Sequence, residues 1–314
     1  MSTKDWILNY GRQFGTFFCL VGLSLALWVL TPHFLTVSNL LNVAQQTSIN
    51  AIIAVGMTFV IITAGIDLSV GSILAFSGVA LASSLQAGFP VPFAILIGLM
   101  VGAVCGLVNG LLITLGRLPP FIATLGVMSV ARGAALLYTE GRPVSGFSER
   151  FRALATGEVL HIPLPVLIMM LIYVIGHFIL TRTKLGRYTY AIGGNEEAAK
   201  LSGVNVTFYK TTVYALCGLL SGFAAVILTA RLNSAQPIAG MMYELDAIAA
   251  TVIGGTSLMG GEGTIFGTLI GALIMGVLRN GLNLLGVSSF IQQIVIGSVI
   301  ILAVLMDTAL KKNR

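Results

Sequence analysis

Long stretches of the chain carry almost no charge, and this feature limits the possible fold more than any other. Ten segments approach the roughly 20 apolar residues that a helix needs to cross a bilayer core of about 30 Å. Charged residues make up only 9% of the 314 residues, whereas a soluble protein carries about 25%. We therefore predict an all-α, polytopic transmembrane helical bundle of about ten spans. The predicted spans are 14–31, 43–64, 69–86, 92–115, 120–138, 163–181, 210–230, 245–259, 264–283 and 289–309.

Two connections between these spans are long. Residues 1–314 are expected to form a single transmembrane domain, in which one long loop covers 139–162 and the other covers 182–209. Long ordered loops in an otherwise tight bundle usually have a task. The first loop could receive a delivered substrate on the outside, and the second could receive mechanical force from the cytoplasm.

The basic residues predict the orientation of the chain. If the N-terminus is cytoplasmic, eleven of the seventeen basic residues fall on the inner side, as the enrichment of Lys and Arg in cytoplasmic loops requires. We expect both termini in the cytoplasm and the chain in the inner (plasma) membrane. The same residues are spread over short loops, so they do not form the continuous basic surface of a nucleic-acid-binding protein. The eleven are Lys4, Arg12, Arg117, Arg182, Lys184, Arg187, Lys200, Lys210, Lys311, Lys312 and Arg314.

Four glycines recur at every fourth residue of the fourth predicted span. A spacing of four places Gly98, Gly102, Gly106 and Gly110 on one face of a helix, where a neighbouring backbone can approach closely. The row therefore predicts tight helix packing.

The segment GIDLSVGS (65–72) places a carboxylate between two apolar runs. A charged group at membrane depth costs about 2.5–3.5 kcal/mol on insertion scales, so Asp67 should have a local partner. One interpretation is that Asp67 or Ser69 caps the N-terminus of the third span. The other is that a broken helix lies here beside the substrate path. Both can hold together.

Two arginines, Arg132 and Arg279, lie within predicted spans. For Arg132 we expect an ion pair with Asp246 or Asp67, because intramembrane charges usually pair with one another. The alternative is that Arg132 lines an aqueous cavity on the translocation path.

The segment 186–206 predicts a short helix that does not cross the membrane. Glycines 193 and 194 should break the chain, Asn195 is a good N-cap, and Gly203 is a natural end. Two glutamates suit the first helical turn electrostatically. We expect this helix to dock onto a partner, the alternative being an idle surface helix. The candidate docking residues are Gly194, Asn195, Glu196, Glu197, Ala198, Ala199, Leu201, Ser202 and Gly203.

The motifs of enzymes are missing from the sequence. No lysine follows a glycine anywhere, so the Gly-Lys of a phosphate-binding loop is absent. The three histidines are scattered and form no metalloprotease motif. We therefore expect no catalytic residue, metal site or cofactor, and any ATP that drives the protein must bind another chain.

Four segments resemble the permeases of bacterial importers for ribose, xylose, arabinose and galactose. The resemblance runs over nearly the whole chain and is greatest to the ribose permeases. It implies a homodimeric pore in membrane lipid, a cytoplasmic ATP-binding-cassette ATPase, a periplasmic sugar-binding protein and a monosaccharide substrate, for which ribose is expected. It also implies that the 194–203 helix is the coupling helix seated in the ATPase. The segments are GIDLSVGS (65–72), LPPFIATLG (118–126), GGNEEAAKLSGVNV (193–206) and VIGGTSLMGGEGTIFGTLIGALIMGVLRNGLNLLGV (252–287).

Other functions remain open at this point. The chain could be a permease for another monosaccharide or a sugar-like ligand. An ion-coupled secondary carrier also shows repeats and broken helices, but it should place coupling carboxylates near the midplane, and only Asp67 is a fair candidate. A membrane-embedded enzyme would need clustered nucleophiles or metal ligands, which the sequence lacks.

Overall fold

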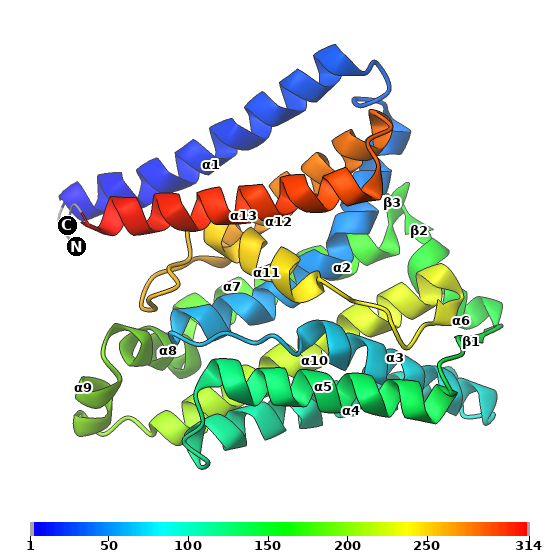
Figure 1. The fold of residues 1–314 in the computed structure, drawn as a ribbon, viewed down its shortest axis with the longest axis horizontal. Coiled ribbons are helices and arrows are strands. Elements are labelled where there is room, and N and C mark those ends of the chain that lie inside the picture. Colours follow the sequence, from blue (N-terminus) through cyan, green and yellow to red (C-terminus); the bar gives the residue numbers. More distant parts are fainter. Residues whose placement is uncertain (1–2, 313–314) are drawn as a thin grey trace.

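The computed structural model describes the backbone of residues 3–312 and the side chains of residues 15–305. This part of the chain is a bundle of helices with four two-residue strands (Figure 1). The helices are α1 (Thr3–Leu30), α2 (Val37–Ile62), α3 (Val70–Gln86), α4 (Val91–Thr114), α5 (Pro120–Thr139), α6 (Glu149–Thr156), α7 (Leu164–Arg182), α8 (Lys184–Gly194), α9 (Glu196–Leu201), α10 (Val206–Leu232), α11 (Tyr243–Ile253), α12 (Ile265–Leu284) and α13 (Ser289–Lys312). The strands are β1 (Val144–Ser145), β2 (Glu158–Val159), β3 (Ile162–Pro163) and β4 (Ser234–Ala235).

The structure confirms an all-α membrane bundle. Six helices, α2, α4, α5, α7, α10 and α12, are long and apolar enough to cross a bilayer. Three further apolar helices are shorter over their described residues, namely 15–30 of α1, α3, and 289–305 of α13. The helix at the eighth predicted span, α11, has 11 residues. Helix α5 begins at a proline, which suits the first turn because its missing N–H is not needed there.

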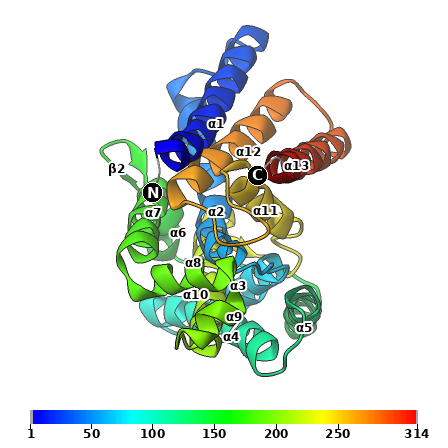
Figure 2. The same ribbon diagram turned by 90° about the vertical axis from the view of Figure 1, so that its left-hand side faces the viewer.

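The helices run side by side between two ends of the molecule (Figure 1). Helices α8 and α9 lie at one end, together with the first turn of α1 and the last turn of α13. The elements β1, α6, β2 and β3 lie at the opposite end. Viewed along the bundle, α2 lies near the centre, with α1, α12 and α13 on one side of it and α4 and α5 on the other (Figure 2). The five terminal basic residues used to orient the chain lie outside the described side chains.

Two helices begin inside the bundle after non-helical segments. Helix α3 follows residues 63–69, and α11 follows residues 236–242. The second segment contacts the first turn of α3, because a Cβ on Gly240 would lie 2.6 Å from the Gly71 carbonyl oxygen. Gly240 also has φ +71°, which an L side chain rarely adopts. The first of these non-helical segments lies where the sequence predicted a break, at 65–72, and the second was not predicted.

The glycine row of α4 makes the tight helix packing that was predicted, against α3 at Gly98 and against α10 at Gly102, Gly106 and Gly110. A Cβ on Gly106 would lie 3.0 Å from the Cα of Gly218, and one on Gly110 would lie 2.6 Å from the Cα of Thr211. Backbones this close leave no room for a side chain. Helix α10 also packs against α2 and α3. The glycine row of α4 therefore sets the position of a central helix of the core.

Candidate functional site

Asp67 lies fully buried in the break between α2 and α3. Its Oδ1 accepts hydrogen bonds from the Ser69 backbone N–H (2.9 Å) and the Ser69 hydroxyl (2.5 Å). The Nδ2 of Asn109 donates to the Ser69 Oγ (2.8 Å) and lies 3.4 Å from Asp67 Oδ1. Within residues 15–305 no basic side chain forms an ion pair with Asp67. The carboxylate is thus held by neutral donors from the break itself and from α4.

The capping interpretation is correct only in part. Ser69 is the N-cap residue of α3, but its side chain makes no capping hydrogen bond and donates to Asp67 instead. Asp67 accepts the backbone N–H of Ser69, one residue before the helix begins. The sequence analysis did not single out Asn109, although a polar side chain inside the glycine row of an apolar span was a usable signal.

The predicted ion pair of Arg132 is wrong. Its Nη1 donates to the backbone carbonyls of Pro237 (2.6 Å) and Ala239 (2.8 Å). These carbonyls belong to the non-helical 236–242 segment, where no helix satisfies them, so they can accept a cation's hydrogen bonds. Arg132 therefore ties α5 to the chain that leads into α11.

The acidic residue expected for Arg132 has another partner. Asp246 accepts from the Nη2 of Arg279 at 2.7 and 2.9 Å and from the Nδ2 of Asn50 at 3.1 Å. The Asp246 side chain is only 5% exposed, while that of Arg279 is 42% exposed. This ion pair joins α11 to α12, and the hydrogen bond from Asn50 joins α2 to the same site.

The 182–209 region contains two helices rather than one. Glycines 193 and 194 do not break the chain, because both lie in the last turn of α8. The break falls at Asn195, whose Oδ1 accepts the Ala198 N–H at 2.9 Å, so the predicted N-cap is confirmed. Helix α9 ends at Leu201, and Gly203 has φ +86°. The helix predicted over 194–203 therefore covers Glu196–Leu201.

Helix α9 is held from one side and open on the other. Its Glu196 pairs with Lys210 of α10 (2.7 Å), and Ala199 is buried. Glu197 is exposed, and Leu201 is 89% exposed. An apolar side chain at the tip of a short, anchored helix leaves a surface on which another protein can pack.

The end of α8 touches the start of the Asp67 break. A Cβ on Gly193 would collide with the Ile62 carbonyl oxygen, which already accepts the Gly261 N–H at 2.9 Å. The Tyr190 hydroxyl donates to the Gly263 carbonyl at 2.6 Å. Burial raises the pKa of Tyr190 to about 12, so this donor keeps its proton at neutral pH. A movement of α8 would therefore displace Ile62, the last residue of α2, through direct contact.

Similarity to known proteins assigns the chain to a protein family. Residues 39–304 match the family described as the permease component of branched-chain amino acid transport systems. The chain belongs to this permease family. Its members are transport components of importers driven by ATP-binding-cassette ATPases, not enzymes.

Several relatives match the permease over nearly its full length. The ribose import permease of Bacillus subtilis (strain 168) is 56% identical over 298 residues, which cover 94% of this chain and 92% of that protein. The ribose import permease of Escherichia coli (strain K12) is 51% identical over 309 residues, 97% of this chain and 95% of that protein. The D-allose permease of the same strain is 42% identical over 302 residues, with coverage of 96% and 93%. No solved structure matches the chain.

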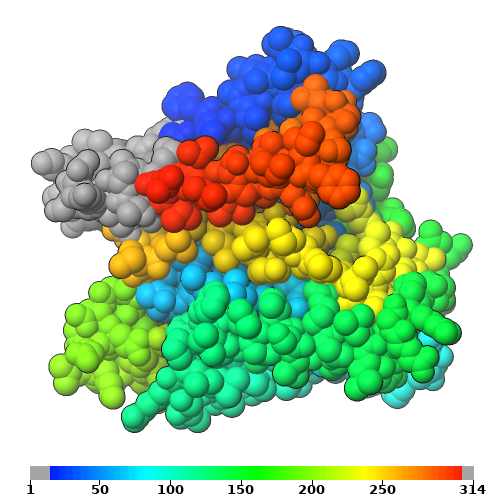
Figure 3. Space-filling model, viewed as in Figure 1, coloured from blue at the N-terminus to red at the C-terminus, as the bar shows by residue number. Residues whose placement is uncertain are grey.

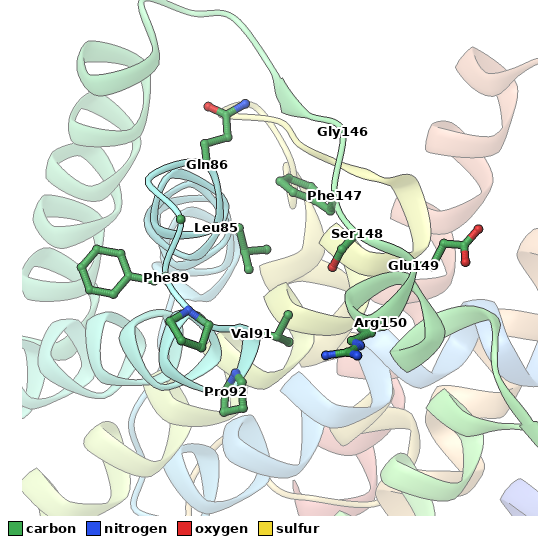
Figure 4. Close-up of a pocket in the computed structure, with 12 residues that line it drawn as sticks. Leu85, Gln86, Phe89, Val91, Pro92, Gly146, Phe147, Ser148, Glu149 and Arg150 are labelled. Carbon is green, nitrogen blue, oxygen red and sulfur yellow. The ribbon is translucent and has the colours of Figure 1, made fainter.

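The long 139–162 loop lies at the end of the permease opposite α8 and α9. Strand β1 pairs with β4, which ties this loop to the segment that leads into α11. An open pocket lies here between the α3–α4 turn and residues 146–150, and Figure 4 shows Phe147 and Val91 on its two sides. A surface hollow next to a loop is the kind of feature that a partner protein can fill.

Proposed function

We propose that this permease is the membrane-spanning part of an ATP-driven importer that carries a monosaccharide, ribose, into the cytoplasm. The observation that carries the proposal is 56% identity, over 94% of the chain, to a ribose import permease. Relatives named for allose and xylose are 42% and 37% identical. Another monosaccharide is the second candidate.

The proposed assembly contains two copies of the permease, a cytoplasmic ATP-binding-cassette ATPase and a periplasmic sugar-binding protein. A separate ATPase is required because the chain has no Gly-Lys pair to bind phosphate. Its docking surface is α9 with its flanks, the residues 194–199 and 201–203, where Glu197 and Leu201 are exposed. The sugar-binding protein docks at the opposite end, where the 139–162 loop lies.

We place ten crossings in the inner (plasma) membrane. The crossing that contains α3 includes residues 63–69, and the crossing that contains α11 includes residues 236–242. Ten crossings put both termini on the side of α8 and α9, and the excess of basic residues assigns that side to the cytoplasm. The arrangement of the helix ends in Figure 1 supports this topology.

Coupling then follows from the contacts of α8. Nucleotide-driven movement of the ATPase shifts α9, which is joined to α8 at Asn195. Gly193 lies so close to Ile62 that an added Cβ would collide with its carbonyl oxygen, and Asp67 follows Ile62 by five residues, in the break after α2. Asp67, Ser69 and Arg132 are the proposed residues of the sugar path, and their hydrogen bonds hold segments 63–69 and 236–242. A shift of Ile62 would therefore move the part of the bundle through which the sugar passes.

A competition experiment tests the substrate. The permease, its ATPase and its sugar-binding protein are reconstituted in liposomes, and ATP-dependent uptake of labelled ribose is measured with excess unlabelled ribose, allose or xylose. Ribose should compete at the lowest concentration. If allose or xylose is accumulated faster than ribose, the ribose assignment fails while the importer assignment stands.

A further inference from the structure

The Asp246–Arg279 ion pair lies between two cavities. The larger has a volume of about 190 Å³ and lies between α11, α12 and α13. The smaller, of about 40 Å³, lies between α2, α11 and α12. Both are lined by Asp246 and Arg279, so one charged pair separates two hollow spaces inside an apolar bundle.

The polar groups around the pair have unused hydrogen-bonding capacity. Arg279 donates to Asp246 only through Nη2, which leaves Nη1 and Nε of a guanidinium with five N–H donors. In the smaller cavity, the Oγ1 of Thr47, a residue that is 5% exposed, has no hydrogen-bond partner among the described side chains. The buried Oδ1 of Asn50 has none there either. Buried polar atoms without partners indicate a water or a ligand. A cavity of 40 Å³ has room for ordered water.

The larger pocket combines donors, acceptors and an aromatic ring. Beside Arg279 it is lined by Tyr243, Gln292 and Gln293. Gln292 already donates to Asn283 (2.8 Å) and the Val287 carbonyl (2.9 Å), whereas Gln293 is exposed and its amide makes no hydrogen bond with residues 15–305. Free guanidinium and amide groups fit hydroxyl groups, which both donate and accept.

The charge and size of the pocket narrow the ligand class. Asp246 and Arg279 neutralise each other, so a charged ligand would gain no counter-ion here. Pockets for drug-sized molecules usually measure about 300–1,000 Å³, and the observed 190 Å³ suits one small molecule. Met241 and Met242 also line the pocket and belong to the segment that Arg132 holds. Figure 3 shows α11 recessed between α5 and α13 on this face of the permease.

The geometry points to a sugar-contact site inside the permease, at the pocket between α11, α12 and α13. Arg279 and Gln293 hydrogen-bond the hydroxyl groups of a neutral monosaccharide. Asp246, which accepts a hydrogen bond from Asn50, holds the guanidinium in position. This inference rests on the proposed function and adds to it a place where the permease itself recognises its cargo.

Two substitutions and a matched control test the site in the reconstituted importer. Arg279→Lys keeps the charge beside Asp246 but loses the guanidinium fork, and Gln293→Ala removes an exposed amide. Ribose uptake should fall about tenfold for Arg279→Lys, as expected when a hydrogen bond to a charged group is lost, and several-fold for Gln293→Ala. Ser298→Ala, an exposed α13 position outside the pocket, should transport like the wild type.

A binding measurement separates recognition from structural support. A Gln293→Cys variant is treated with a small thiol reagent, the reaction of the wild type is subtracted, and ribose, xylose or allose is added. Protection by a monosaccharide supports the site. Wild-type uptake by Gln293→Ala together with no protection by any of the three sugars overturns it. If Arg279→Lys fails to assemble, the Gln293 variants alone decide. If the wild-type importer takes up no monosaccharide, the proposed function fails, and the protection assay still reports on the pocket.

Discussion

At Gly106 a single added carbon meets the backbone of the neighbouring helix α10. We expect Gly106→Leu to reduce stability by at least about 1–3 kcal/mol, the usual cost of inserting extra methylenes into a packed core. The measurement is the thermal stability of the purified permease together with its amount in the membrane. Gly22→Leu on α1 is the control, because no atom lies within 4 Å of its added Cβ. Equal stability of the two variants would show that the α4–α10 contact is not tight.

Arg132 donates hydrogen bonds to two backbone carbonyls of the 236–242 segment. Arg132→Met leaves the Pro237 and Ala239 oxygens without their donor, and a buried group that loses its partner costs about 1–3 kcal/mol. We expect a lower unfolding temperature and reduced sugar uptake. Arg132→Lys, which keeps a cationic donor, should retain more of both. If Arg132→Met matches the wild type in both measurements, the carbonyl contacts are dispensable.

The sequence predicted where buried polar residues would occur, but not all of their partners. An arginine in an apolar run must be satisfied, yet its spacing does not say by what. Arg132 was expected to pair with Asp246 or Asp67, and the fold instead brings Arg279 to Asp246 from another helix. Backbone carbonyls are invisible as partners in a sequence, because every residue has one and only a non-helical segment frees it. Local partners were predictable, as Ser69 shows for Asp67.

At the scale of elements, α8 and α9 link the open surface of the permease to the break after α2. We expect Gly193→Ala to disturb coupling, because its Cβ would collide with the Ile62 carbonyl. Gly194→Ala is the matched control, since nothing lies within 4 Å of its added Cβ. The measurement is the number of sugar molecules imported per ATP hydrolysed by the reconstituted importer. Gly193→Ala should lower this ratio several-fold, and an unchanged ratio would argue against transmission through Ile62.

The helices themselves were largely predictable. Apolar runs give the positions of α3, α4, α5, α7 and α12 to within one residue of each end. The bilayer core offers no water to free backbone groups, so a long apolar run there must be helical. The prediction was less accurate for the 182–209 region. There Gly193 packs closely against the Ile62 carbonyl and the Gly261 backbone, and both Gly193 and Gly194 lie within α8 instead of breaking the chain, which only the three-dimensional contacts can show.

At the scale of the whole molecule, the topology can be tested by thiol labelling. Single cysteines are introduced at Lys200 and Arg150, and intact cells are treated with an impermeant thiol reagent. The cysteine at Arg150 should react, because the proposed topology places the 139–162 loop outside, and the cysteine at Lys200 should react only after the cells are opened. Labelling at Lys200 in intact cells would reverse the proposed orientation of the bundle.

The central claim is that this permease moves sugar only when a partner ATPase drives it. The most direct measurement compares liposomes that contain the purified permease alone with liposomes that also contain the ATPase and the sugar-binding protein. We expect no ATP hydrolysis and no ribose uptake from the permease alone, and ATP-dependent accumulation from the full assembly. Ribose uptake by the permease alone, driven by a proton or sodium gradient, would contradict the account.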